Sequence, residues 1–188
     1  MRLPVLAALV LAAVLAPCAE AAAQAKAASD RCPNADATPG EASVKALQAG
    51  TLCLVNAERA ARGLQPLRAQ TALAQAAGSF ARQMDVLKFF DHISPSGSTT
   101  LSRVRSSGYL RSARRWHLGE NIGWGSGLLA TPRAAVQAWM ASPGHRRNLL
   151  SPGFAEIGIG IARGAPQTLC DGAVAGIYVG DFGRRKRT

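Results

Sequence analysis

The stretch that decides the fold is EIGIGIA, residues 156–162, in which isoleucine alternates with glycine or alanine. Together with GIYVGDFG at 176–183, it predicts two β-strands, because successive side chains of a strand point to opposite faces of a sheet. Ile157, Ile159 and Ile161 then share one face. The intervening glycines let a helix or another backbone approach the sheet closely.

Three segments have the periodicity of amphipathic helices, with apolar residues three or four positions apart. We expect these helices at residues 40–62, 72–88 and 132–141. The first follows a capping-box pattern, in which Thr38 is the N-cap and Glu41 stands three residues later. The chain therefore predicts an α+β domain in which helices surround a small sheet.

The segments between these helices and strands are expected to be short or irregular. LSRVRSSGY at 101–109 is compatible with a short helix that ends at Gly108. RSARRWH at 111–117 is expected to be basic and exposed, and GENIGWG at 119–125 to be a short segment with glycines at both ends.

The N-terminus has the layout of a secretory signal peptide. Arg2 precedes an apolar run at 3–17, and small residues follow. The run is shorter than the about 20 residues that a membrane-spanning helix needs. We predict a signal peptide over residues 1–23, a secreted mature protein without a transmembrane span, and an extended, poorly packed arm over 24–37.

Three cysteines follow the predicted signal peptide: Cys32, Cys53 and Cys170. Export permits a disulfide, and three single pairings are open. We favour Cys32–Cys53, because this bond would tie the N-terminal arm to the first helix. Cys170 would then be free or paired between molecules.

The chain has a formal net charge of +11 at pH 7, and most of the excess is arginine. A basic exported protein is drawn to anionic surfaces of the cell envelope. Basic residues also form the predicted C-terminal tail, residues 184–188. No stripe of basic residues interleaved with aromatic residues occurs, so specific nucleic-acid recognition is not expected.

The sequence contains no phosphate-binding glycine motif, no H-E-x-x-H and no G-x-S-x-G. His92, Glu120 and His145 remain, each next to a turn. Two imidazoles and a carboxylate can bind a divalent metal, most plausibly zinc. The alternatives are that each histidine is simply exposed or hydrogen-bonded, and that Glu120 ties down a loop.

Four ordered motifs resemble the bacterial branch of the CAP superfamily, which includes cysteine-rich secretory proteins, antigen 5 and plant pathogenesis-related proteins. The motifs are DHISPSGST at 91–99, GENIGWG at 119–125, AVQAWMASPGHRRNLL at 135–150 and EIGIGIA. LCLVNAERAARGLQPL at 52–67 is similar to the usual opening of the branch. The resemblance implies a CAP (SCP-like) domain, here residues 38–183, folded as an α-β-α sandwich with a small, mainly antiparallel central sheet.

The resemblance also implies a shallow cavity in which two histidines and two glutamates bind zinc or a similar ion. His92, Glu120 and His145 match three of these positions, and Ser142 stands where the second glutamate is found. A metal triad with weaker binding is therefore expected. Pro143 would begin a new helical turn, whose dipole, together with Arg146 and Arg147, would keep His145 neutral.

These observations favour a secreted, non-catalytic binding module for a lipid or sterol-like molecule, a cell-wall component or a protein ligand. The first alternative is a basic cell-wall-adhering protein held by its arginines and its tail. The second is a metal-assisted hydrolase, such as a peptidase, in which zinc activates water and Glu120 or Ser94 assists.

Overall fold

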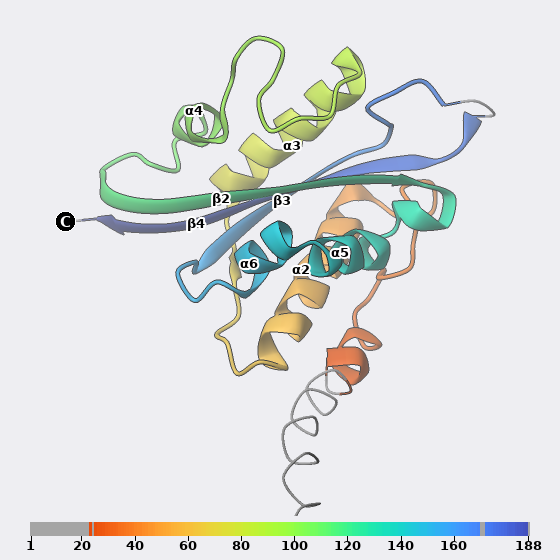
Figure 1. Ribbon diagram of the computed structural model, residues 1–188, viewed down its shortest axis with the longest axis horizontal. Helices are drawn as coiled ribbons and strands as arrows, with labels where there is room; N and C mark the ends of the chain where they lie inside the picture. The colour runs from red at the N-terminus through yellow and green to blue at the C-terminus, as the bar shows by residue number, and fades with distance from the viewer. Residues whose placement is uncertain (1–22, 24, 170–171, 188) are drawn as a thin grey trace, which may run out of the picture.

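A four-stranded sheet forms the centre of the molecule in the computed structural model, which describes residues 23, 25–169 and 172–187 (Figure 1). The strand order is β1 (Arg68–Ala69), β3 (Glu156–Ala162), β4 (Ala175–Arg187) and β2 (Ala113–Ser126). β1 runs parallel to β3, whereas the other two pairs are antiparallel. The mainly antiparallel sheet is confirmed, and β2 lies at its edge.

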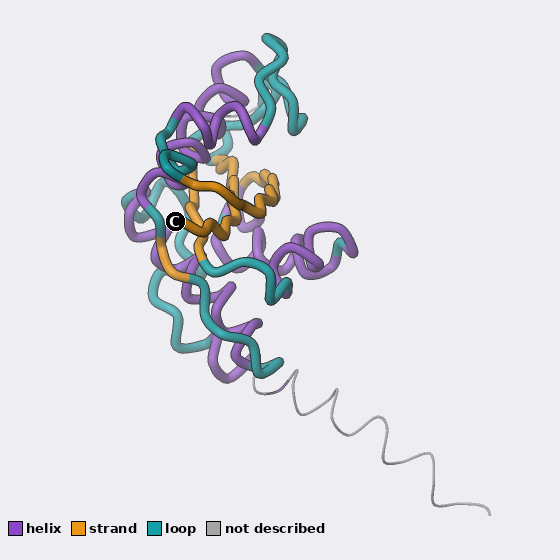
Figure 2. Tube along the Cα trace, turned by 90° about the vertical axis from the view of Figure 1, so that its left-hand side faces the viewer, coloured by secondary structure: helices purple, strands orange, loops and turns teal. Residues whose placement is uncertain are grey.

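Helices cover both faces of the sheet. Helices α3 (Thr71–Leu87) and α4 (Thr100–Ser106) lie on one side. On the other side lie α2 (Val44–Ala60), α5 (Pro132–Ala141) and α6 (Pro143–Leu150). The view along the sheet in Figure 2 shows the strands between these helical layers. The architecture is the predicted α-β-α sandwich.

The core has one part on each face of the sheet. Ile157, Ile159 and Ile161 are buried in a cluster with Trp139 and other residues of α2 and α5, as their shared face predicted. The second cluster contains residues of α3 and the opposite face of β2 and β4: Ala77, Phe80, Ala81, Met84, Ile122, Ala162, Ile177 and Val179. Residues of β2 and β4 that share a face with Ile122 therefore point toward α3 and α4.

Two glycines in β3 permit the close packing of α3. A Cβ atom on Gly158 would overlap the backbone of α3 at Leu73 and Ala74, and one on Gly160 would overlap it at Ala77. The close approach expected from the alternating glycines is confirmed at these two positions.

The first helix begins later than predicted. The Thr38 backbone N–H does donate to Glu41 Oε2 at 2.8 Å, but this bond closes a turn that precedes the helix. Helix α2 begins at Val44, and Ser43 caps it by accepting from the Ala46 N–H. The other two helices agree with the sequence to within one residue at each end.

The N-terminal arm is better packed than predicted. Residues 25–29 are helical, and Cys32 and Ala35 are buried. Cys32 forms the predicted disulfide with Cys53, with an S–S distance of 2.02 Å. The arm also accepts a hydrogen bond at Ala35 O from the Arg133 N–H of α5. The predicted signal peptide (except for its last residue) and Cys170 lie outside the described residues.

The segment 111–126 also differs from the expectation. The basic stretch at 111–117 is largely exposed, as expected, but residues 113–126 form one continuous strand, and residues 184–187 of the predicted tail are the end of its partner β4. The charged residues and glycines of β2 have a low intrinsic preference for strands. Backbone pairing with β4 along the whole length of β2 outweighs this preference. None of the described helices is long and apolar enough to cross a membrane.

Candidate functional site

His92 and Glu120 form a direct hydrogen bond, with 2.7 Å between His92 Nδ1 and Glu120 Oε1. Glu120 comes from the edge strand β2, and its side chain is only 2% exposed. His92 comes from the loop after α3, and its side chain is 49% exposed. The pair therefore has a buried carboxylate and an imidazole that reaches solvent.

Arg103 of α4 binds the second oxygen of Glu120, with 2.6 Å between Arg103 Nη2 and Glu120 Oε2. Its guanidinium also stacks on the ring of Phe80, 3.3 Å from the ring centroid. It donates to two backbone carbonyls of the His92 loop, at His92 and Ser98. Arg103 thus joins α3, α4, β2 and the loop at a single buried cation.

The position of α4 follows from its local sequence. Thr99 caps the helix, and Thr99 and Ser102 form a capping box in which each side chain accepts from the other residue's backbone N–H. Val104 is buried and fixes the rotation of the helix. Arg103 then points toward the sheet beside Glu120.

Asp181 of β4 stands directly opposite Glu120 in the register of β2 and β4. Directly opposed residues lie on the same face of a sheet, so the two carboxyl groups are neighbours. Asp181 is 1% exposed, and its carboxyl oxygens have no hydrogen-bond partner within the described residues. The site therefore contains a second buried acid that the sequence did not identify.

The surroundings of these groups determine their protonation. Burial and the nearby charge of Glu120 raise the pKa of Asp181 well above its ordinary value, which favours its protonated form. Burial alone would raise the pKa of Glu120, but the hydrogen bond from His92 and the charge of Arg103 outweigh it and lower this pKa. The same hydrogen bond raises the pKa of His92.

His145 approaches β2 from the opposite helical layer. It is the third residue of α6, and its carbonyl accepts from Asn121 Nδ2 at 3.0 Å. Asn148 of the same helix donates to the carbonyl of Glu120 and to Asn121 Oδ1. These bonds fix α6 beside the strand residues that carry the site.

The pKa of His145 is lowered, which agrees in direction with the expected neutral imidazole. The cause differs from the prediction. Burial has the largest effect, and the positive charge of His92 adds to it. The adjacent arginines at 146 and 147 are exposed, and solvent screens them.

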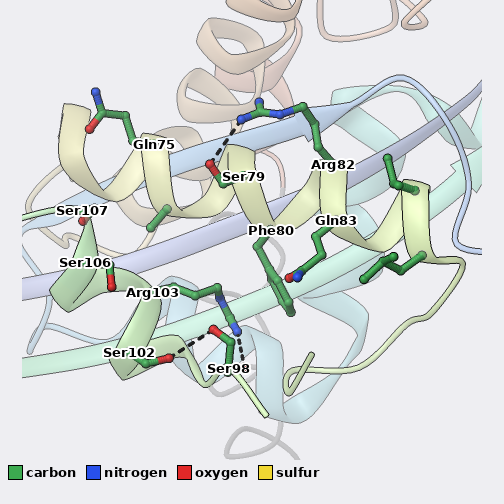
Figure 3. A pocket seen from close by; sticks show the side chains of 13 residues that line it. Gln75, Ser79, Phe80, Arg82, Gln83, Ser98, Ser102, Arg103, Ser106 and Ser107 are labelled. Carbon is green, nitrogen blue, oxygen red and sulfur yellow. Dashed lines mark hydrogen bonds between the residues drawn. The ribbon is translucent and has the colours of Figure 1, made fainter. Parts of the chain in front are cut away.

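A groove of about 840 Å³ lies beside Arg103, between α3 and α4 (Figure 3). One part of its lining is apolar, with Val86 and Leu87 at the end of α3. The other part is polar: Gln75, Ser79, Arg82, Gln83, Ser98, Ser102, Arg103, Ser106 and Ser107. The groove therefore offers one apolar surface and many hydrogen-bonding groups.

The family model described as "CAP: Cysteine-rich secretory protein family" matches residues 52–182. The chain belongs to the CAP family. This confirms the resemblance that the four motifs carry.

Similar proteins support this assignment and the fold of the CAP domain. The uncharacterized protein YkwD of Bacillus subtilis (strain 168) is 37% identical over 123 residues, which are 65% of this chain and 45% of that protein. The chain thus spans less than half the length of this relative.

Two solved structures share the fold. An extracellular protein containing an SCP domain from Bacillus anthracis str. Ames has a TM-score of 0.57 and 24% identity, over 77% of this chain and 45% of that chain. An outer surface protein from Borrelia burgdorferi has a TM-score of 0.55 and 23% identity, over 70% of this chain and 87% of that chain.

The predicted metal triad of the CAP domain does not fit the geometry as it stands. Both oxygens of Glu120 are bound, one by His92 and one by Arg103. Within the part of the chain that the structure describes, no three His, Cys, Asp or Glu side chains are grouped so that they could hold a metal ion. A metal bound through Glu120 would have to share these oxygens with His92 and Arg103 or displace one of them.

His117, which the sequence places in a basic stretch, lies outside this cluster. It is exposed, and its ring packs against Phe154 with 4.5 Å between the ring centroids. It therefore provides an internal control for the other two histidines.

Sequence reasoning missed Arg103 and Asp181. Arg103 is one of many arginines, and only the burial of its neighbour Val104 indicates which way it points. Asp181 carried a clearer signal, because a single acid within the apolar strand segment GIYVGDFG must be buried or functional.

Proposed function

We propose that this CAP domain is a secreted, non-catalytic binding protein that holds a lipid-like amphipathic molecule in the groove between α3 and α4. The observation that carries the proposal is the two-sided lining of the groove. Val86, whose exposed fraction is 73%, and Leu87 present apolar surface to solvent, where it favours contact with an acyl or ring system. The serines of α4 offer donors and acceptors to a polar headgroup.

More large apolar residues are exposed in the segment that follows Val86 and Leu87 in sequence. Phe90, Ile93 and Leu101 are also exposed large apolar residues, and they lie in the loop and helix that follow α3. Clustered exposed apolar residues mark interaction sites more often than scattered ones do. The His92 loop and α4, which carry these residues, are fixed to the sheet by Arg103.

Secretion is part of this proposal. It is supported by the basic residue and apolar run of the predicted signal peptide and by the disulfide between Cys32 and Cys53, which suits an oxidising compartment. Two of the structural neighbours are described as an extracellular and an outer surface protein. Amino-terminal sequencing of the native protein tests it, with a first residue between 22 and 26 expected.

Binding is favoured over hydrolysis by the bonds of the candidate groups. Ser94 Oγ lies 2.9 Å from Ser96 Oγ and accepts from the Ser98 N–H, so its hydrogen bonds serve the loop. His92 Nδ1 is bound to Glu120. A nucleophile needs a base within hydrogen-bond reach, and no serine or threonine hydroxyl in the described residues is bonded to a histidine.

A fluorescent long-chain fatty acid is a suitable probe for the groove. Replacing Val86 and Leu87 with aspartate should weaken its binding at least about tenfold, because a charge opposes contact with an acyl chain. The matched control replaces Leu128 and Leu129 with aspartate. Both leucines are exposed, Leu128 at 86%, and they are far from the groove residues in sequence. Equal binding by both double variants contradicts the groove.

A second proposal concerns zinc or another divalent metal. Because Glu120 is bonded to His92 Nδ1, the other ring nitrogen, Nε2, can act as a metal ligand. A carboxylate that bonds the non-ligating nitrogen of a histidine commonly orients it for metal binding. His145 is close enough for the charge of His92 to lower its pKa, and its neutral ring could supply a second nitrogen. Weak binding by two imidazoles, with Glu120 as the orienting residue, replaces the original triad.

Isothermal titration with zinc tests this second proposal. His92→Ala and His145→Ala should each lower the affinity sharply, whereas His117→Ala should change it little. Binding should weaken below about pH 6, because protonated imidazoles cannot bind a metal. If all three variants bind zinc as the unchanged protein does, neither His92 nor His145 is a ligand.

A further inference from the structure

One end of the β2–β4 pair is a projecting ribbon that carries many cations. We define this basic ribbon as residues 113–117 of β2 and 184–186 of β4. Figure 1 shows both strands continuing past α4 and α6 toward the C-terminus. Residues 114–117, 184 and 186 are exposed, so the usual alternation of buried and exposed side chains is lost here. The ribbon contributes little to the core.

Like charges face one another across the ribbon. Arg115 stands directly opposite Lys186, and Arg184 lies on the same face, opposite His117. Directly opposed cations destabilise a pair of antiparallel strands. This charge pattern lowers the stability of the strand pair, and hydrophobic packing does not require it here. A purely structural role therefore does not explain the pattern.

Acidic residues that could neutralise this end are scarce. Between residues 92 and 155 the only acid is Glu120, which is buried and already bound to Arg103. Residues 182–188 contain no acid. The nearest acid in β3, Glu156, accepts the Tyr109 hydroxyl at 2.6 Å. None of the ion pairs among the described residues includes a residue of the basic ribbon.

A hollow of about 610 Å³ lies beside one face of the ribbon. It is lined by His117 of β2, by Arg146 and Arg147 of α6, and by the ring of Phe154 on which His117 packs. Its lining contains no acidic residue. Arg184, the cross-strand neighbour of His117, adds another cation on the same face.

The other face has a smaller hollow of about 420 Å³. Arg105 and Arg111 line it together with Trp116, and its lining also lacks an acid. Arg185, the cross-strand neighbour of Trp116, stacks on Tyr109 instead of pairing with an acid. Cations are therefore presented on both faces of the ribbon.

From these observations we infer that the basic ribbon, with Arg146 and Arg147, is a binding surface for a linear, phosphate-bearing polyanion. Arginine binds phosphate oxygens through paired N–H donors. Closely spaced cations that neutralise a chain of phosphates release the counterions held by that chain, which favours binding. A flexible chain can follow cations around both faces of a ribbon. A flat lipid surface can contact only one face at a time, so the chain is the better match.

The test uses linear inorganic polyphosphate as the probe and the purified protein. The ribbon variant carries Arg115→Ser, Arg184→Ser and Lys186→Ser. The matched control carries Arg31→Ser, Lys45→Ser and Arg163→Ser, which removes the same charge from exposed positions elsewhere. Affinity is measured over a range of salt concentrations, and vesicles of phosphatidylglycerol are titrated in parallel.

We expect the ribbon variant to lose at least about tenfold in polyphosphate affinity and its salt dependence to flatten by about two in log–log slope. The control should change affinity by less than about threefold. The melting temperature of the ribbon variant should not fall, because opposed like charges have been removed. Polyphosphate should raise the melting temperature of the unchanged protein more than that of the ribbon variant.

Two results would overturn the inference. Equal loss of polyphosphate affinity in the two triple variants would show that net charge alone is responsible. Tight binding to the vesicles without binding to polyphosphate would assign the ribbon to a membrane surface instead.

Discussion

The guanidinium of Arg103 lies 2.6 Å from the carboxylate of Glu120, and both side chains are nearly removed from solvent, at 8% and 2% exposure. A buried charge is costly unless a partner and hydrogen bonds compensate it. Here the compensation is mutual, and it also holds the His92 loop and α4 against the sheet. The stability of this region therefore depends on one cation.

Replacing Arg103 with alanine should lower the free energy of unfolding by about 3–5 kcal/mol, because Glu120 would be left as an uncompensated buried charge. Lysine at this position should restore part of the loss, since it keeps the charge but not the fork of donors. Urea unfolding provides the measurement. Arg82→Ala, at an exposed position of α3, is the control and should change stability by no more than about 0.5 kcal/mol.

Asp181→Asn should make the metal-free protein more stable at neutral pH. The pKa of Asp181 in the folded state is raised well above the ordinary value of 3.8 for an aspartate. Its stabilising effect is therefore complete below that ordinary value and is lost as the pH rises toward the pKa of the folded state. Asparagine stays neutral at every pH and avoids this loss.

Unfolding free energies measured with a chelator between about pH 4 and pH 8 test this prediction. The difference between the variant and the unchanged protein should grow with pH in favour of the variant. The pKa of Glu120 is lowered, so its stabilising effect is lost as the pH falls, opposite to that of Asp181. Glu120 is present in both proteins. A difference that does not vary with pH would show that Asp181 is not protonated in the folded protein.

The parts of the fold that were predictable are those with a strong local period. The strand predicted from the alternation at 156–162 and the helix predicted from the apolar stripe at 72–88 are both present in the structure, because each element buries the face that its pattern makes apolar. Strand β2 was missed, since glycines interrupt its pattern. Gly123 and Gly125 are needed for contact with Trp139 and with the backbone of Leu129, and such contacts cannot be read from local sequence.

The candidate site was predictable only for residue types that occur rarely in the sequence. His92 and Glu120 stood out as rare residue types, and the structure does bring them together. Arg103 did not stand out among the arginines, and its role depends on which face of a seven-residue helix is buried. The metal triad stays a prediction, and in the structure the two oxygens of Glu120 are bonded to His92 and Arg103.

The packing of α3 on β3 makes a prediction about glycine. Gly158→Ala and Gly160→Ala should each destabilise the protein by at least about 1–3 kcal/mol, because the added methyl group meets helix backbone, which cannot move as a side chain could. Thermal or urea unfolding would detect this.

The matched control is Gly144→Ala, in the first turn of α6. No atom outside its immediate neighbours lies within 4 Å of the added Cβ, so this change should be neutral or stabilising by up to about 1 kcal/mol. If alanine were tolerated equally at all three positions, the close approach of α3 to β3 would be refuted.

The disulfide between Cys32 and Cys53 should stabilise the protein by about 3 kcal/mol, since it closes a loop with a sequence separation of 21 and restricts the unfolded chain. It also fixes the arm, whose Ala35 carbonyl accepts a hydrogen bond from α5. Replacing both cysteines with serine should therefore lower the free energy of unfolding by about that amount. It should also make the arm cleavable near residues 31–37 under limited proteolysis. Reductant should bring the unchanged protein to the stability of the double variant and leave the variant itself unaffected. If reductant destabilised both proteins equally, the loss would have to come from a source other than this bond.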